Sequence, residues 1–145
     1  MAKSQLETLI EISEDILDQA TKNLGQAIHA RDQAVAQLGT LEQYRNDYQS
    51  RLVSTAERGL TVTQFANFQG FIEKLDQAIV GQKKVIIDAE YKVERATREW
   101  QECEKKRLSY QTLSNRQLLE QQQKISKREQ KETDELALKS FFYKK

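Results

Sequence analysis

The sequence is poor in the residues that interrupt secondary structure. It has no proline, and glycine occurs at only 5 of its 145 positions. Proline and glycine are the residues that most often mark turns and loops. Their scarcity argues against a multi-strand sheet or a fold with many tight turns. It favours a few long helices, and we predict a single domain over residues 1–145.

The residues that build reactive sites are also scarce. Cys103 is the only cysteine and His29 is the only histidine, which excludes an internal disulfide and a cysteine-based metal cage. Glycine-rich phosphate loops and G-x-S-x-G motifs are absent as well. The many Asp and Glu residues are interpreted as solvated helix surface. We therefore predict that the protein is not an enzyme and has no catalytic residues, no metal site and no cofactor.

Long apolar runs are missing too. No stretch approaches the roughly 18 residues that a membrane-spanning helix needs. Acidic residues such as Glu11 and Asp15 occupy the place where a secretory signal would be apolar. The 23 basic and 22 acidic side chains nearly balance, whereas a nucleic-acid-binding domain is usually strongly basic. These features predict a cytoplasmic protein that does not bind nucleic acid.

What the sequence does contain is heptad periodicity. Stepping alternately by four and three residues from Leu6 to Leu52 gives 14 positions, of which 11 are apolar. The same steps from Phe68 to Tyr110 give 13 positions, of which 11 are apolar when Cys103 is counted. Three to four heptads are already enough to indicate a coiled coil. We call these two sets of positions the first and second seams, and each predicts a long helix.

The turn between the two seams is short. Gly59 is the glycine best placed to end a helix, and Thr61 followed three residues later by Gln64 fits a capping box. Thr63 is an equally good cap. We predict a first helix over about residues 4–55, a turn over about 56–62, a second helix over about 63–113, and an extension over 114–145.

Two seams of similar length joined by a short turn predict an antiparallel hairpin folded about residue 60. This register places Ala20 opposite Trp100 and Ala34 opposite Ile86, so that small side chains oppose large ones, as an interdigitated core requires. It also places the polar Ser13 opposite Arg107. The predicted fold class is all-α, a long antiparallel two-helix coiled-coil hairpin with a helical or frayed C-terminal extension.

Beyond Tyr110 the seam disappears. The extension is rich in helix-forming residues but has few apolar ones, and isolated helices are marginal in water. One interpretation is a solvated helix that frays. The other is a segment that becomes ordered on a partner, which the consecutive aromatic residues Phe141, Phe142 and Tyr143 support.

Three stretches of the sequence resemble the flagellar export protein FliJ family. They are LETL at 6–9, YRNDYQSRL at 44–52 and NFQGFIEKLDQAI at 67–79. The Tyr-x-x-x-Tyr element, the turn of similar length and the aromatic-rich start of the second helix follow the order found in the family. The resemblance covers about residues 6–110.

The resemblance implies a function in the flagellar type III export apparatus. FliJ-like proteins are cytoplasmic, stalk-like components that are peripheral to the inner-membrane export apparatus. Their partners are the hexameric export ATPase, whose assembly and activity they promote, the cytoplasmic domain of the large export gate membrane protein, and the export chaperones that they escort.

The resemblance also implies a gate-binding surface. The familiar form of the family has a histidine at the position of Gln82, so any pH-linked role there is in doubt. The register places some of these positions in a seam, where they support a surface rather than form the contact. The implied positions are Gln37, Leu41, Tyr44, Tyr48, Phe71, Leu75, Ala78 and Gln82.

Other functions are compatible with the same pattern. The runner-up is a structural or tethering coiled coil, or the related stalk of a virulence type III secretion system. A third class is an electrostatic nucleic-acid or membrane binder, for which binding would fall steeply with salt.

Overall fold

A computed structural model describes residues 4–143, which form two α-helices. Helix α1 covers Gln5–Arg58 (54 residues) and helix α2 covers Val62–Tyr143 (82 residues). No strand occurs within these residues, and the predicted all-α hairpin is confirmed. The last two residues of the predicted extension, 144 and 145, lie outside the described residues, as do residues 1–3.

Local contacts define the helix ends. Ser4 caps α1, because its Oγ accepts a hydrogen bond of 3.1 Å from the backbone N–H of Glu7. Gly59 follows α1 with a φ of 105°, a left-handed conformation that side chains with a Cβ rarely adopt. At the start of α2, Thr61 and Gln64 exchange two hydrogen bonds of 3.1 Å between side chain and backbone. This capping box makes Thr61, and not Thr63, the cap.

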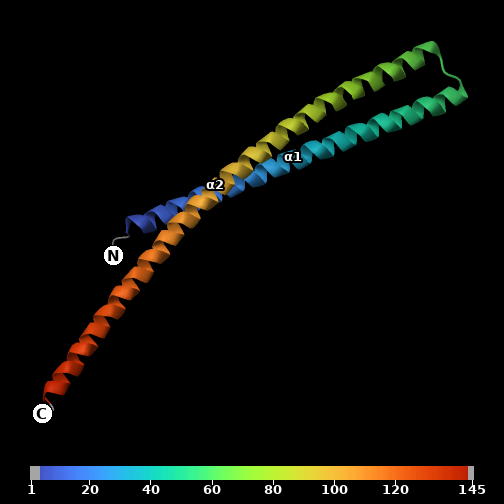
Figure 1. Cartoon of the computed structure of the whole chain (residues 1–145). Coiled ribbons are helices and arrows are strands. Elements are labelled where there is room, and N and C mark those ends of the chain that lie inside the picture. Colours follow the sequence, from blue (N-terminus) through green and yellow to red (C-terminus); the bar gives the residue numbers. More distant parts are fainter. Residues whose placement is uncertain (1–3, 144–145) are drawn as a thin grey trace. The chain divides into compact units, whose positions relative to one another are not determined.

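The contacts between helices divide the chain into two compact units, and one of them is Gln19–Gln101. Within this unit α1 and α2 run side by side and antiparallel, joined by the loop at residues 59–61 (Figure 1). Trp100 Nε1 donates a hydrogen bond of 2.9 Å to Thr21 Oγ1, and Gln82 Nε2 donates one of 2.9 Å to the backbone oxygen of Ala34. Both pairs match a hairpin folded about residue 60.

The core of this unit is thin and follows the seams. Every predicted seam position between 19 and 101 is buried or half-buried. The most buried apolar side chains are Ala20, Ala34 and Leu75, with exposed fractions of 8%, 6% and 9%. Two of these three are alanines, because a small side chain lets the opposite helix approach closely. A hairpin of two helices covers each seam from one side only, which leaves the larger seam residues partly exposed.

The second unit comprises Met1–Asp18 and Glu102–Lys145. Ser13 is its buried polar residue, with 6% exposure, and its Oγ donates a hydrogen bond of 2.7 Å to the backbone oxygen of Ile10. Arg107 Nη2 donates one of 3.0 Å to Glu104 Oε1. Each member of the predicted polar layer thus bonds within its own helix, and the buried Nε of Arg107 has no hydrogen-bond partner.

Helix α2 continues past the predicted end at residue 113 without a break and reaches Tyr143. The extension is thus part of the second helix. Every residue from 115 to 143 is exposed, which agrees with the loss of the seam beyond Tyr110. Within residues 4–143, neither helix has an apolar stretch long enough to cross a membrane.

Candidate partner-binding surface

The eight predicted gate-binding residues all lie in the unit formed by Gln19–Gln101. Four belong to α1 and four to α2, and the antiparallel register brings the two groups to the same part of the hairpin. We call this set the candidate surface; it consists of Gln37, Leu41, Tyr44 and Tyr48 on α1, and Phe71, Leu75, Ala78 and Gln82 on α2.

The exposure of these residues divides them into two sets. Tyr44 and Phe71 expose 59% and 43% of their surface, and Gln37 and Ala78 are exposed as well. Leu75 is buried. The remaining three are half-buried, namely Leu41, Tyr48 and Gln82. The four exposed residues are available for contact with another molecule. The four buried or half-buried residues are seam positions, and they pack beneath the exposed ones between the two helices.

Aromatic packing joins the two helices at this surface. The ring of Tyr48 on α1 lies 4.3 Å from that of Phe71, centroid to centroid, at an interplanar angle of 34°. The same ring lies 5.4 Å from that of Phe68 at 59°. Offset and tilted arrangements at such distances are favourable for aromatic pairs. Phe71 is therefore both exposed and held in place by a partner on the other helix.

An ion pair crosses the hairpin beside this aromatic cluster. Arg45 on α1 donates a hydrogen bond through Nε to the carboxylate of Asp76 on α2. This hydrogen bond, and then the charge of Asp76, raise the pKa of the Arg45 guanidinium above its ordinary value. Arg45 adjoins Tyr44 and Asp76 adjoins Leu75, so the pair ties the helices together next to the surface residues. Sequence reasoning missed this pair, because it recorded Arg45 only as a polar seam position.

Gln82 also ties the helices together. Besides its bond to Ala34, its Nε2 donates a hydrogen bond of 3.3 Å to Gln37 Oε1. Gln37, Leu41 and Gln82 line a shallow groove together with Thr40. A glutamine amide carries no charge near neutral pH. The two hydrogen bonds that Gln82 makes to α1 therefore do not depend on the protonation of its side chain.

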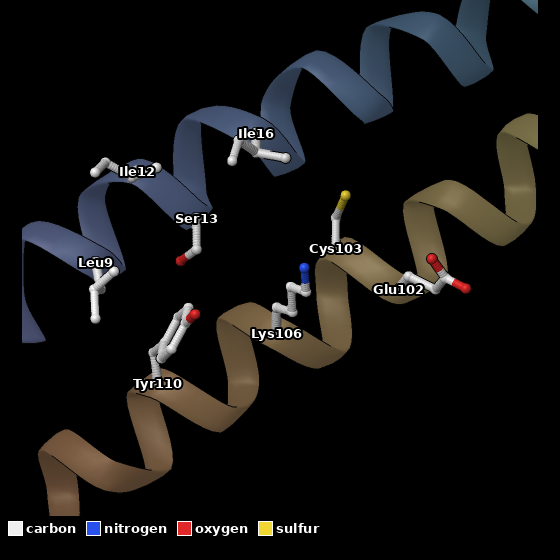
Figure 2. Close-up of a pocket in the computed structure, with 8 residues that line it drawn as sticks. All are labelled: Leu9, Ile12, Ser13, Ile16, Glu102, Cys103, Lys106 and Tyr110. Atoms are coloured by element: carbon white, nitrogen blue, oxygen red, sulfur yellow. The ribbon is translucent and has the colours of Figure 1, made fainter.

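A second hollow lies in the other unit, between the first turns of α1 and the middle of α2 (Figure 2). It has a volume of about 180 Å³. Its apolar wall is formed by Leu9, Ile12 and Ile16, whose exposed fractions are 42%, 48% and 53%. Opposite them lie Cys103, Lys106 and Tyr110, together with Glu102. Leu9 and Ile16 flank the first seam, so this groove is a widening of the apolar stripe.

No group of three or more His, Cys, Asp or Glu side chains within residues 4–143 is arranged to hold a metal ion. What the geometry offers instead is contact surface on a hairpin of two helices. The fold and the candidate surface define the class: an antiparallel coiled-coil hairpin with exposed aromatic side chains.

Comparison with known proteins identifies the family. Residues 2–145 match the sequence model of the family described as "Flagellar FliJ protein". The flagellar FliJ protein of Salmonella typhi is 32% identical over 132 residues, which are 91% of this chain and 90% of that protein. The flagellar FliJ protein of Escherichia coli K12 is 31% identical over the same length and the same shares of the two chains.

The chain belongs to the FliJ family of flagellar proteins. This places it among the components of the flagellar type III export apparatus, in agreement with the family that the three sequence stretches suggested. A solved structure of a Chlamydia trachomatis protein, described as a YscO homologue, has the same fold. Its TM-score is 0.68 at 18% identity, over 94% of this chain and 93% of that one.

Proposed function

We propose that this protein is the stalk-like component of the export apparatus that binds the hexameric export ATPase and promotes its assembly and activity. In this proposal it also binds the cytoplasmic domain of the large export gate protein and escorts export chaperones. It acts in the cytoplasm, peripheral to the inner membrane. Membership of the FliJ family supports the role as a whole.

One observation carries the gate-binding part of the proposal. Tyr44 and Phe71 are large aromatic side chains that stay exposed, yet the surface around them is held by the Tyr48 ring, the Arg45–Asp76 pair and the bonds of Gln82. Aromatic anchors are enriched among the residues that dominate binding energy at protein interfaces. The packing of Phe71 against the Tyr48 ring orders this anchor before binding, which reduces the entropy lost on association.

The test is binding of the purified full chain to the purified cytoplasmic domain of its cognate gate protein, by calorimetry. Replacing both aromatic anchors, in Tyr44→Ala with Phe71→Ala, should weaken binding at least about tenfold, since truncating such residues typically costs about 2 kcal/mol or more. The matched control is Phe65→Ala with Tyr91→Ala. Phe65 and Tyr91 lie in the same unit outside the candidate surface and are 42% and 66% exposed.

The control variant should bind like the original chain. Equal loss in both variants would contradict the assignment of this surface. Far-UV circular dichroism on each variant checks the fold, because a collapse of helicity in the Tyr44→Ala, Phe71→Ala variant would make these residues part of the core.

The ATPase part of the proposal has its own measurement. Adding the full chain to the purified cognate export ATPase should raise its rate of ATP hydrolysis and its fraction of hexamer. An ATPase that neither binds the chain in a pull-down nor changes its hydrolysis rate would refute this part without affecting the gate-binding surface.

Among the alternatives, the sequence matches favour the flagellar role over the virulence one. The relatives at 32% and 31% identity are both flagellar proteins, whereas the likeness to the YscO homologue, at 18% identity, is one of fold alone. A homodimeric tether is disfavoured by the seams, which are already covered within one chain. Analytical ultracentrifugation should give the mass of a monomer, and the mass of a dimer would favour the tether.

A further inference from the structure

Helix α2 continues as a single helix beyond the start of α1 (Figure 1). Leu9 and Tyr110 line the same hollow between the helices. Four residues further along each helix from this pair, Gln5, the first residue of α1, therefore lies opposite about residue 114. Ser114 is the last half-buried residue of α2, and residues 115–143 are all exposed. We call residues 115–143 the tail, which α1 does not reach.

The tail carries a sparse apolar stripe. Leu118 and Ile125 are seven residues apart, as are Leu136 and Tyr143, and eleven residues separate Ile125 from Leu136. Repeats of seven and of eleven residues both return side chains to one side of a helix. We call these four residues the tail stripe, and in chain order their exposed fractions are 55%, 55%, 68% and 88%. The spacing is the same from either end, so two antiparallel tails bring Leu118 opposite Tyr143 and Ile125 opposite Leu136.

The charged side chains around the tail stripe form two blocks of opposite sign. Residues 124–128 contain three basic and no acidic side chains, and residues 132–135 contain three acidic and no basic ones. The antiparallel register that aligns the stripe also places residues 124–128 opposite residues 133–137. The basic block consists of Lys124, Lys127 and Arg128, and the acidic block of Glu132, Asp134 and Glu135.

The order of the blocks selects one orientation of two tails. In an antiparallel pair each block faces mainly the opposite charge. In a parallel pair each block would face its own copy, and juxtaposed like charges are unfavourable and help to set helix orientation in coiled coils. The tail is thus complementary to itself, in charge and in apolar spacing, in the antiparallel arrangement only.

We propose that the tail is a self-association surface on which the tail of a second copy of this chain packs in antiparallel orientation. A twofold axis near residues 130 and 131 relates the two copies, so both bury the same tail stripe. The space for the second tail is open. Tyr143 of the second copy lies opposite Leu118, one turn beyond Ser114, where the cover by α1 ends.

The pair is weak. Its apolar contacts come from the four stripe residues of each copy, and exposed ion pairs contribute little each. Glu129 of one copy also lies opposite Glu132 of the other, which places one like-charge contact on each side of the axis. The chain is therefore a monomer at low micromolar concentration and dimerises only when concentrated, as mass action requires. A homodimeric tether would instead stay dimeric on dilution.

The first experiment is sedimentation equilibrium of the full chain at about 5 μM and about 300 μM, between which a weak dimer forms by mass action. Dimer should appear at the higher concentration and decrease as salt rises. Ile125→Ala with Leu136→Ala should raise the dimer dissociation constant at least about tenfold, because apolar surface is no longer buried. The matched control is Leu119→Ala with Leu138→Ala, which truncates two tail leucines off the stripe, 55% and 58% exposed, and should dimerise like the original chain.

The second experiment reverses the charged blocks. Changing all three residues of the basic block to Glu, or all three of the acidic block to Lys, should raise the dissociation constant at least about tenfold, since blocks of like charge then face each other. A variant with both changes exchanges the two blocks within one chain and is again complementary to itself. It should dimerise like the original chain, although it differs from it at six positions.

Three results would overturn the proposal. They are a monomer at the higher concentration, a stripe variant that dimerises as well as the original, and a block-exchanged variant that stays as weak as the two single-block variants. Far-UV circular dichroism at low concentration checks that each variant keeps its helix. A dimer that persists on dilution and ignores the charge variants would reject the tail pair in favour of the tether.

Discussion

Residues 19–101 and residues 115–143 are both helical, but they differ completely in burial. In the first region every seam position is buried or half-buried, whereas in the second every residue is exposed. Both regions are rich in the same helix-forming residue types. The difference is the seam, which is present from Phe68 to Tyr110 and absent afterwards. Residue composition is therefore enough to favour a helix, but it takes periodic apolar residues to make that helix pack.

The two regions also differ in what holds them together. Residues 19–101 have contacts between the helices, including the Trp100–Thr21 bond and the Tyr48–Phe71 pair. Bonds within 115–143 connect residues one turn apart, such as Gln130 with Asp134. Such local pairs contribute only a few tenths of a kcal/mol each. The first region should thus unfold cooperatively, and the second should lose its helix gradually.

The largest expected effect comes from proline in the paired region. Ala34→Pro removes a backbone hydrogen bond and places its ring against the preceding turn, which costs about 3 kcal/mol or more. Urea unfolding followed by far-UV circular dichroism should show a clear drop in the transition midpoint. Ala137→Pro, the same change in the unpaired region, should reduce the initial helix signal and leave that midpoint in place. Equal midpoints for the two variants would contradict the division into paired and unpaired helix.

A smaller effect is expected from truncating a leucine. Leu75→Ala should cost about 2 kcal/mol, at the low end of values for buried leucines, because a core only one layer thick can collapse around the gap. Leu119→Ala is the matched control, since Leu119 is 55% exposed, and should change the free energy of unfolding by less than about 0.5 kcal/mol. A similar cost at both positions would mean that the extension is covered in solution.

The smallest effect concerns the ion pair between the helices. Asp76→Asn should lower the melting temperature slightly at low salt, and the difference should vanish at high salt, because exposed pairs are weak and screened. Asp88→Asn, which breaks an ion pair with Lys92 inside α2, should have less effect, since that pair does not join two helices. A loss of stability for Asp76→Asn that persists at high salt would contradict this interpretation.

The pH dependence of the Arg45 contribution follows from the direction of its pKa shift. The pKa of Arg45 is raised in the folded state. Its contribution is fully present below the ordinary pKa of arginine and is lost only as the pH rises through the raised value. Between neutral and mildly alkaline pH, the difference in melting temperature between the original chain and Asp76→Asn should therefore stay constant.

Much of the fold was predictable from the sequence. The two seams, a cap at Thr61 or Thr63 and the fold about residue 60 follow from heptad spacing and turn chemistry, which are local properties; the structure decides for Thr61. The second helix was predicted over about residues 63–113, followed by a helical or frayed extension over 114–145, and α2 is helical as far as Tyr143. Heptad periodicity indicates which part of a helix packs against another helix. Beyond that part, the helix propensity of the residues is enough for the helix to continue.

Less of the candidate surface was predictable. The eight residues came from the family resemblance, and the register already placed Leu41, Tyr48, Leu75 and Gln82 in or near a seam. The cross-helix partners of that surface were not found. Asp76 was not singled out, and Gln82 was not seen to reach the backbone of Ala34. These contacts depend on which side-chain rotamers meet across the hairpin, and spacing along one helix does not contain that information.

The sequence by itself determined that this chain is helical, where its helices turn and which residues face the partner helix. Heptad spacing and capping depend only on neighbours a few residues away, so they can be read along the chain. The tertiary structure alone decided that Tyr44 and Phe71 stay exposed while Tyr48, Arg45 and Gln82 hold the surface around them. Exposure and cross-helix contact are properties of two segments together, and they exist only once the antiparallel register is set.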